Sequence, residues 1–255
     1  MIELKDIGLS FESDGKHVHK IMGVEVPGCT SISGLFPDDG WKFAWPPKLM
    51  YEYMWKNFII ADIMKLSVDD AETLYETHLK KAKVAWREKR DKSADTGTLG
   101  HSIIEKYITE KMGGAVIPFM GISVDKEINN ILEQFLEWEK KYNPIWLASE
   151  LQVGSKVHGF AGILDAIAEI NGKKVLLDFK TSKEIKPEYN IQLAGLSIAL
   201  EEQGFIAEER AILHLPKSGK YEYKEIKSAF KDEEMDFLVG LAFYKRKNMF
   251  RGRYK

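Results

Sequence analysis

Cysteine is nearly absent from this chain, which has one, Cys29, among its 255 residues. A single thiol cannot form an internal disulfide, and it excludes a four-thiolate iron–sulfur cluster. Any metal ion that the protein holds must therefore be bound through oxygen and nitrogen atoms.

Long apolar runs are also missing. No stretch reaches the roughly 18 to 20 residues that a membrane-spanning helix requires, and the N-terminal segment lacks the basic start and apolar centre of a signal peptide. We therefore expect a soluble, cytoplasmic protein with no membrane partner. Hydrophobic residues nevertheless make up 44% of the chain, which is enough to bury a substantial core.

No excess of either charge marks the chain, whose formal net charge is −2. A net charge this small gives no overall attraction to a polyanion, so a nucleic acid would have to be bound by local basic patches. The phosphate-binding loop, the dinucleotide fingerprint and the His-Glu-x-x-His pattern of zinc proteases are all absent from the sequence.

What is present is a regular alternation of helical and strand periodicities. The expected helices cover residues 67–92, 97–111, 123–142 and 188–203, with a closing helix from about residue 229 onward. The expected strands cover residues 146–153, 157–170, 174–180, 211–215 and 221–226, and a small hairpin around Asp14-Gly15 precedes them all. This order predicts an α/β fold: a mixed central β-sheet flanked by helices, with an N-terminal β-hairpin and a helical elaboration.

Two aspartates should meet across one hairpin of this sheet. If Asn171-Gly172 forms the two-residue turn that its sequence favours, Asp165 lies directly opposite Asp178. Because side chains alternate along a strand, both carboxylates and Lys180 then share one face. A longer loop would instead place Asp165 opposite Phe179, on the other face.

The two carboxylates would be close enough to repel each other. Like charges opposite each other destabilise a sheet unless a proton or a cation lies between them. Carboxylate oxygens select hard cations, and Mg²⁺ held by one or two carboxylates is usual where phosphoryl groups react. Lys180 could reach the ligands, an attacking water or a phosphate. The alternative is a cross-strand salt-bridge cluster on a solvated face.

His101 and Glu105 add to this set from an earlier helix. They are four residues apart and therefore share one helix face, bordered by Ile104 and Ile108. An imidazole beside an inward-facing apolar row is a candidate ligand for Mg²⁺ and suits Mn²⁺ better. A hydrogen-bonded histidine at a helix end is the alternative for His101 taken alone.

Over roughly residues 15–200 the sequence resembles the RecB-type nucleases of the PD-(D/E)XK superfamily, especially phage and mitochondrial-type single-strand exonucleases. The resemblance is carried by Val26–Ile32, Gly97-Thr98 with His101 and Glu105, Ser149-Glu150, Gly162 with Asp165, Asp178-Phe179-Lys180-Thr181-Ser182, and Gln192. Ordered motifs at these spacings are far more specific together than any one alone.

The resemblance implies a divalent-metal-dependent DNA nuclease, in particular an exonuclease on single strands or free ends. It implies that His101, Asp165, Asp178 and the backbone carbonyl of Phe179 hold Mg²⁺ or Mn²⁺. Lys180 would then position or activate water.

Three further residues have roles by the same resemblance. Glu105 and Glu150 would orient ligands or water. Gln192 would contact DNA or the catalytic lysine. The RecB pattern usually has a tyrosine four residues after this glutamine, whereas this chain has Leu196.

Basic and aromatic residues supply candidate DNA contacts. We expect Lys80, Lys81, Arg87 and Arg90 to bind DNA, together with Thr181, Ser182 and Gln192 beside the motif. Further candidates are Lys83, Lys89, Lys92, the tail residues Lys245, Arg246, Lys247, Arg251, Arg253 and Lys255, and, for base stacking, Trp86 and residues 41–45. A solvated helix face, a frayed tail and aromatic core packing are the alternatives.

The sequence leaves three functions open. They are an exonuclease of replication, recombination or repair, a structure-selective endonuclease, and a catalytically inactive nucleic-acid-binding module. An inactive module would not need the metal-ligand and lysine set, which favours an enzyme. We expect one nuclease domain, with an N-terminal elaboration over residues 1–95, a catalytic core over 96–228 and a C-terminal helix with a basic tail over 229–255.

Overall fold

The computed structural model describes residues 2–12, 18–36, 41–59, 64–114, 125–226 and 230–253. The chain divides into two compact units, one formed by Met1–Pro37 with Leu99–Lys255 and the other by Asp38–Thr98. Within the described ranges, no helix is long and apolar enough to cross a membrane. The predicted turn at Asp14-Gly15, the start of a helix at residue 123 and Lys255 lie outside the described residues, as do the side chains of residues 41–43 and 250–253.

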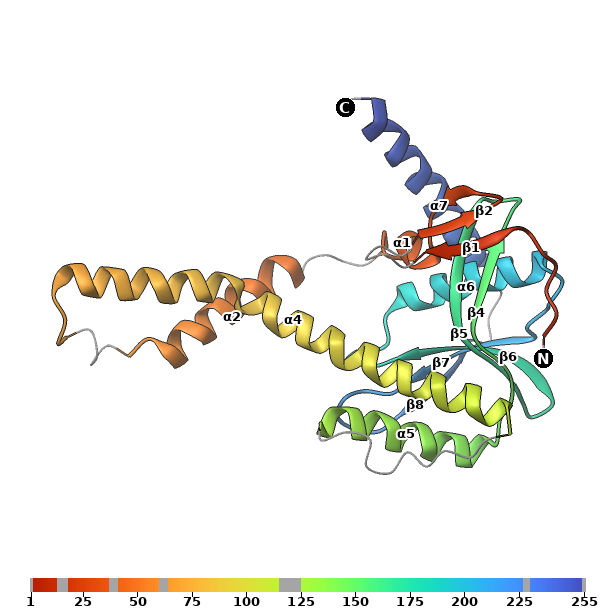
Figure 1. The fold of residues 1–255 in the computed structure, drawn as a ribbon, viewed down its shortest axis with the longest axis horizontal. Helices are drawn as coiled ribbons and strands as arrows, with labels where there is room; N and C mark the ends of the chain where they lie inside the picture. Colours follow the sequence, from red (N-terminus) through yellow and green to blue (C-terminus); the bar gives the residue numbers. More distant parts are fainter. Residues whose placement is uncertain are drawn as a thin grey trace. The chain divides into compact units, whose positions relative to one another are not determined.

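A five-stranded mixed sheet forms the centre of the larger unit, in the order β4-β5-β6-β7-β8 (Figure 1). Its strands are β4 (Ile145–Ser155), β5 (Phe160–Ile170), β6 (Lys173–Lys180), β7 (Glu209–His214) and β8 (Glu222–Ile226). Strands β6 and β7 are parallel, and the other neighbours are antiparallel. A parallel pair requires a crossover, which helix α6 (Pro187–Glu202) supplies. The predicted mixed sheet flanked by helices is confirmed.

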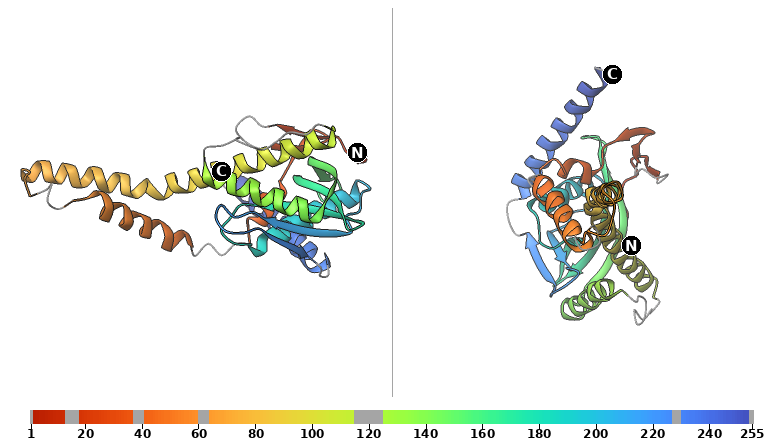
Figure 2. Two further views of the ribbon diagram at one scale, coloured as in Figure 1. Left: turned by 90° about the horizontal axis from the view of Figure 1, so that it is seen from below. Right: turned by 90° about the vertical axis from the view of Figure 1, so that its left-hand side faces the viewer.

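Helices cover both faces of this sheet, so it has a buried core on each side. On one face, Leu196 of α6 and Phe237 pack with Leu176 of β6. On the other face, Phe135 and Trp138 pack with Leu177 of β6. Figure 2 views the ribbon of the sheet and its helices from two other sides. The first face is covered by α1 (Cys29–Ser33), α6 and α7 (Phe230–Arg253), and the second by α5 (Lys126–Tyr142) with residues 99–112 of α4 (Val68–Met112).

A small antiparallel sheet precedes the central one. It contains β1 (Leu9–Glu12), β2 (Val18–Ile21) and β3 (Val24–Val26), in that order, so a third strand joins the predicted hairpin. The chain then reaches β5, where Ala161 N donates to the Pro27 carbonyl at 3.0 Å and Gly28 forms a parallel bridge with Ala161. The N-terminal segment is thereby attached beside the strand that carries Asp165.

The smaller unit is helical. Helix α2 (Trp41–Asn57) leads to Phe58, whose ring lies 5.5 Å from Tyr75 and 5.8 Å from His78 of α4. Helix α4 begins where the sequence predicts, because Asp70 N donates to Ser67 Oγ at 3.2 Å as a capping residue requires.

The break predicted between residues 92 and 97 is wrong, because α4 runs unbroken from Val68 to Met112. The Thr96 hydroxyl donates to the Lys92 carbonyl at 3.0 Å, one turn back, so it stays within the helix instead of capping a new one. Gly100 has a packing role: a Cβ there would lie 3.3 Å from Ile131 of α5. The glycine therefore serves close helix approach and is not a helix start.

Candidate active site

The turn and register predicted for the β5–β6 hairpin are confirmed. Asn171 and Gly172 have φ values of 53° and 78°, the left-handed pair that a two-residue type I′ turn needs. From this turn the ladder runs from Ile170↔Lys173 to Ala166↔Leu177. Its next pair in register would be Asp165 with Asp178.

The backbones of Asp165 and Asp178 do not pair in this ladder. This corrects the prediction that the two residues lie directly opposite each other. Instead, Phe179 N donates to the Asp165 carboxylate oxygen Oδ2 at 2.6 Å, so a side-chain oxygen is the acceptor in place of a backbone carbonyl of the neighbouring strand. On its other edge, β6 continues to pair with β7 as far as Lys180↔His214. Strand β5 therefore diverges from β6 at Asp165 while β6 stays in the sheet.

The divergence coincides with a change in how β5 presents its side chains. Leu164 and Ile167 pack into the same core, whereas Ala166 packs into the other one. Strict alternation would have put Leu164 and Ala166 on one face. On the neighbouring strand, the register brings Glu150 level with Asp165, and Glu150 has a left-handed φ of 45°. Both strands are thus irregular where the acidic residues meet.

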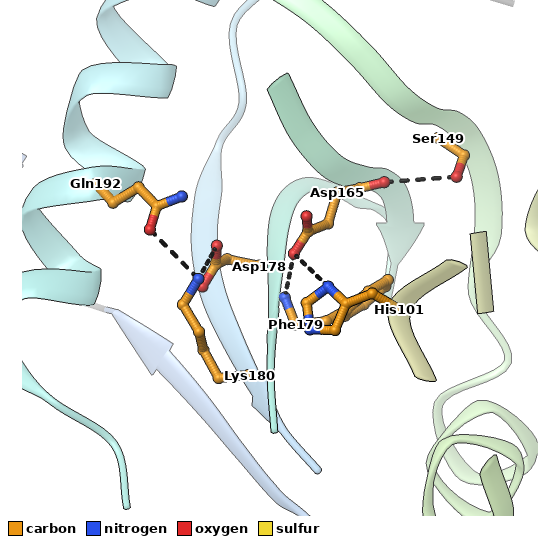
Figure 3. A network of polar contacts seen from close by, with 7 residues as sticks. All are labelled: His101, Ser149, Asp165, Asp178, Phe179, Lys180 and Gln192. Atoms are coloured by element: carbon orange, nitrogen blue, oxygen red, sulfur yellow. Dashed lines mark hydrogen bonds and ion pairs between the residues drawn. The ribbon is translucent and has the colours of Figure 1, made fainter. Parts of the chain in front are cut away.

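Asp178 is the most deeply buried acid of the site, with 2% of the residue exposed. Its Oδ1 accepts from Lys180 Nζ at 2.7 Å, and its Oδ2 has no hydrogen-bond partner among the described residues (Figure 3). Burial raises the pKa of Asp178 to about 7, against the lowering effect of the Lys180 ammonium and with a further rise from the Asp165 charge. A buried carboxylate oxygen without a partner is costly unless a cation or proton binds it.

Lys180 lies among partners that hold its ammonium in place. Besides Asp178, Gln192 Oε1 of α6 accepts from Nζ at 3.3 Å, and Nζ lies 4.8 Å above the ring of Tyr189. Burial alone would lower the pKa of Lys180, but the Asp178 and Asp165 carboxylates outweigh it, and the net shift is upward. The lysine therefore remains charged at neutral pH.

His101 reaches the site from α4. Its Nδ1 lies 4.0 Å from Asp165 Oδ2, and its ring packs edge-on against Phe179 with centroids 6.3 Å apart. The side chains of His101 and Asp165 are 30% and 25% exposed, so a solute can reach them. His101 is inside the helix, which excludes the helix-end alternative. The predicted neighbourhood of imidazole and carboxylate is present (Figure 3).

Glu105 and Glu150 form a second acidic pair next to Asp165. Burial first, then a hydrogen bond and the charge from Glu150, then the charge of Asp165, raise the pKa of Glu105 to about 7. A hydrogen bond between two carboxyl groups requires one proton between them. This pair can therefore store a proton near neutral pH within reach of Asp165.

The donor set suits a hard divalent cation. Two carboxylates and an imidazole are acceptable ligands for Mg²⁺ or Mn²⁺, and Asp178 Oδ2, which has no partner in the described part of the chain, offers one coordination position. As the side chains lie, no group of three His, Cys, Asp or Glu residues in the described part of the chain is arranged to hold a metal ion. Phe179 N and Lys180 Nζ instead bind Asp165 and Asp178. The ligand set His101, Asp165, Asp178 and Phe179 carbonyl stays a prediction.

The residues after the motif act mainly within the protein. The Ser182 hydroxyl donates to the Glu184 carbonyl at 2.8 Å, and His214 Nε2 lies 2.7 Å from the Ser182 carbonyl. Thr181 is half-buried. These contacts fix the loop that follows Lys180, and a DNA-binding role for Thr181 and Ser182 stays a prediction.

Leu196, where the RecB pattern usually has a tyrosine, is a core residue, and another residue of α6 places an aromatic ring beside Lys180. Leu196 is 1% exposed and lies 2.8 Å from where a Cβ on Gly162 would be, so it belongs to the core. The aromatic ring beside Lys180 comes from Tyr189, one turn before Gln192 on α6. Sequence reasoning missed Tyr189, although its spacing of three residues from Gln192 places both on one helix face.

The basic run of the smaller unit is on the surface. Lys80, Lys81, Arg87 and Arg90 are all exposed. Lys80 pairs with Glu76 at 3.2 Å, and Arg90 pairs with Asp91 at 2.7 Å. The guanidinium carbons of Arg87 and Arg90 lie 5.5 and 5.1 Å from the centre of the Trp86 ring. These residues therefore form an exposed basic and aromatic surface.

No family model matches this sequence, and no relative is found among curated proteins. Solved structures give weak likenesses. One is a Eubacterium rectale protein with a provisional exonuclease assignment (TM-score 0.41, 15% identity, 60% of this chain and 65% of that one). Another is the alkaline exonuclease LHK-Exo of Laribacter hongkongensis (0.36, 12%, 58% and 80%). A third is SSO0001 (0.29, 21%, 46% and 59%), so the chain spans less than two thirds of that protein. These are some of the solved structures that this chain is similar to.

Proposed function

We propose that this protein is a divalent-metal-dependent DNA nuclease that hydrolyses phosphodiester bonds, acting as an exonuclease on single strands or free ends. One observation carries the proposal. Where β5 diverges from β6, the carboxylates of Asp165 and Asp178 meet the Lys180 ammonium and the His101 imidazole. A purely structural salt bridge would not need an imidazole, or a carboxylate oxygen that has no partner among the described residues.

The ligands for the cation would be His101, Asp165, Asp178 and the Phe179 carbonyl. Mg²⁺ or Mn²⁺ held there supplies Lewis-acid polarisation of the phosphate and lowers the pKa of water. The two aspartates and the imidazole would hold this cation, and Asp178 lies on the part of β6, Val175–Lys180, that pairs with β7.

Lys180 has a separate task. Its raised pKa keeps it protonated, so the ammonium can stabilise the charge that builds up on the phosphate oxygens. Gln192 and Tyr189 limit where Nζ can lie, which keeps the charge aimed at one point.

The Glu105–Glu150 pair suits proton transfer. A carboxyl with a pKa of about 7 can take up or release a proton at physiological pH, as a general base or acid must. Glu105 is one turn from His101 on α4, so its proton would exchange with water near the reacting phosphate.

DNA cleavage assays test the proposal. The purified chain is incubated in Mg²⁺ with linear and circular single-stranded DNA of one sequence. We expect loss of the linear form only, no reaction in EDTA, and no reaction with Asp165→Asn. The matched control Asp236→Asn changes an exposed aspartate of α7 and should keep full activity.

Other outcomes would point elsewhere. Cleavage of the circle identifies an endonuclease. Binding of DNA without cleavage of linear, circular or duplex DNA, in either Mg²⁺ or Mn²⁺, identifies an inactive binding module and overturns the proposal.

A further inference from the structure

A cavity of about 380 Å³ lies in the larger unit and has no part in the mechanism above. Its walls come from three places in the chain: the small N-terminal sheet, the start of α1 and strand β5. The lining residues are Phe11, His19, Gly28, Cys29, Thr30, Ser31, Gly162 and Ile163. The volume is within the range of about 300 to 1,000 Å³ that small-molecule sites occupy.

The cavity adjoins the candidate active site along β5. Strand β5 pairs with β6 only over Ala166–Ile170, and near its start Ala161 is bridged to Gly28. Gly162 and Ile163, which line the cavity, lie between that bridge and Asp165. At about 3.3 Å per residue, Ile163 is about 7 Å along the strand from Asp165. A ligand in the cavity would therefore be next to the reacting group.

The wall formed by the small sheet is aromatic. The rings of Phe11 and His19 have centroids 5.1 Å apart and an angle of 43° between their planes. Gly28 lies close against this wall, because a Cβ there would be 3.3 Å from the His19 ring. Aromatic rings on one side of an open cavity suit a planar, unstacked base.

Another part of the lining is polar, and the described residues that form it carry no negative charge. Thr30 and Ser31 are exposed there, at the first turn of α1, and their hydroxyls can donate to an anion. Burial raises the pKa of the Cys29 thiol, so this side chain stays neutral. Among the described residues that line the cavity, none is acidic. An anionic ligand therefore meets no repulsion from its walls.

We propose that this cavity binds one nucleotide unit of the DNA strand, with the base against Phe11 and His19 and the phosphate at the Thr30 and Ser31 hydroxyls. The inference rests on the proposed function and adds the place where an unpaired nucleotide of the strand is held. A base stacked inside a duplex cannot present its face to the aromatic wall, whereas an unpaired base can. The cavity thereby selects single-stranded DNA at a position next to the bond that is cleaved.

Binding measurements in EDTA test the cavity without requiring cleavage. The probe is a fluorescent single-stranded oligothymidylate, followed by anisotropy. Ser31→Glu places a negative charge at the proposed phosphate position, and we expect the Kd to rise about tenfold. An acidic residue in the first turn of a helix does not oppose folding. Ser218→Glu, the same change at an exposed loop position, should leave the Kd unchanged.

A second variant tests the base contact. Phe11→Leu keeps an apolar side chain but removes the ring, and we expect a several-fold weaker affinity for the oligothymidylate and no change for an abasic oligomer of equal length. Equal affinity of Ser31→Glu and the natural chain would overturn the inference, as would an equal loss on the two oligomers with Phe11→Leu. These assays contain no metal and measure binding alone, so their results can be interpreted even if the protein does not cleave DNA.

Discussion

The two ends of the β5–β6 pair have opposite characters. At the closed end, the turn at Asn171-Gly172 and the ladder over Ala166–Ile170 pair the backbone in register, and most of the side chains on β5 are buried and apolar. At the open end, the ladder stops and the Asp165 carboxylate accepts from Phe179 N. Regular pairing stabilises the fold, and its interruption leaves the Asp165 carboxylate to bind a backbone N–H beside Asp178 and Lys180.

The difference is also electrostatic. The closed end carries its charges at the surface, whereas the open end buries Asp178 with one oxygen unpartnered among the described residues. Such a group costs folding stability, and natural proteins tolerate this cost mainly at functional sites. We therefore expect substitutions at the open end to affect cleavage and substitutions at the closed end to affect stability.

The largest expected effect is that of Asp178→Asn. It removes a proposed cation ligand, and cleavage of linear single-stranded DNA should fall by about a thousandfold or more. Binding of the same DNA in EDTA should persist. Normal cleavage rates in single-turnover assays would contradict the role given to Asp178.

The same variant should change how stability depends on pH. Because the folded protein raises the pKa of Asp178 from 3.8 to about 7, it binds this proton more tightly than the unfolded chain does. The stabilisation that this bound proton gives the folded protein is complete at pH values below the ordinary pKa of 3.8, and it is lost as the pH rises through about 7. In urea unfolding of the metal-free protein, the free energy of unfolding should fall between pH 4 and pH 7, and it should fall less for Asp178→Asn. Some dependence on pH should remain in this variant, because the pKa of Glu105 is also raised. Equal slopes would argue against the buried charge.

Lys180→Met should have the next largest effect. The methionine fills a similar volume without the ammonium, so cleavage should fall by about a hundredfold while oligonucleotide binding in EDTA changes little. Lys140→Met, at an exposed position on α5, is the matched control and should cleave normally. A loss confined to KM, with unchanged kcat, would make Lys180 a binding residue.

At the closed end, Gly172→Val should act on stability alone. Gly172 has a φ of 78°, which a β-branched residue adopts with difficulty, and the free energy of unfolding should fall by about 1–2 kcal/mol. Cleavage per folded molecule should be unchanged. A large loss of activity in the folded variant would show that the two ends are not separable.

The smallest expected effect is that of Tyr189→Leu. Removing the ring 4.8 Å from Lys180 Nζ takes away a cation–π contact of about 0.5–1 kcal/mol, which corresponds to a two- to fivefold loss of kcat. Tyr189→Phe keeps the ring face and should restore the rate. If phenylalanine fails to do so, the hydroxyl and not the ring matters.

Sequence periodicity predicted most of the fold because the apolar patterns and the turn signals agreed. Asn171-Gly172 fixed the register of β5 and β6, since a type I′ turn allows only one pairing. The unbroken helix α4 could not be predicted in this way. Gly97 and Gly100 resemble helix boundaries until the packing of Ile131 against Gly100 is known.

The candidate site was predictable only in part. The spacing of Asp178 and Lys180 on one strand places them together, as does that of His101 and Glu105 on one helix. The loss of the ladder at Asp165 was not predictable, because alternation assumes a regular strand. Tyr189 was missed, although its spacing of three residues from Gln192 on α6 could have placed it on the same helix face.

The most direct test is a crystal structure with Mn²⁺ bound, located by its anomalous scattering. We expect a peak between Asp165 and Asp178 with carboxylate oxygens about 2.0–2.3 Å away and His101 as a further ligand. A chain that cleaves DNA in Mn²⁺ but binds the ion elsewhere, or that shows no peak at this position at saturating Mn²⁺, would contradict the account.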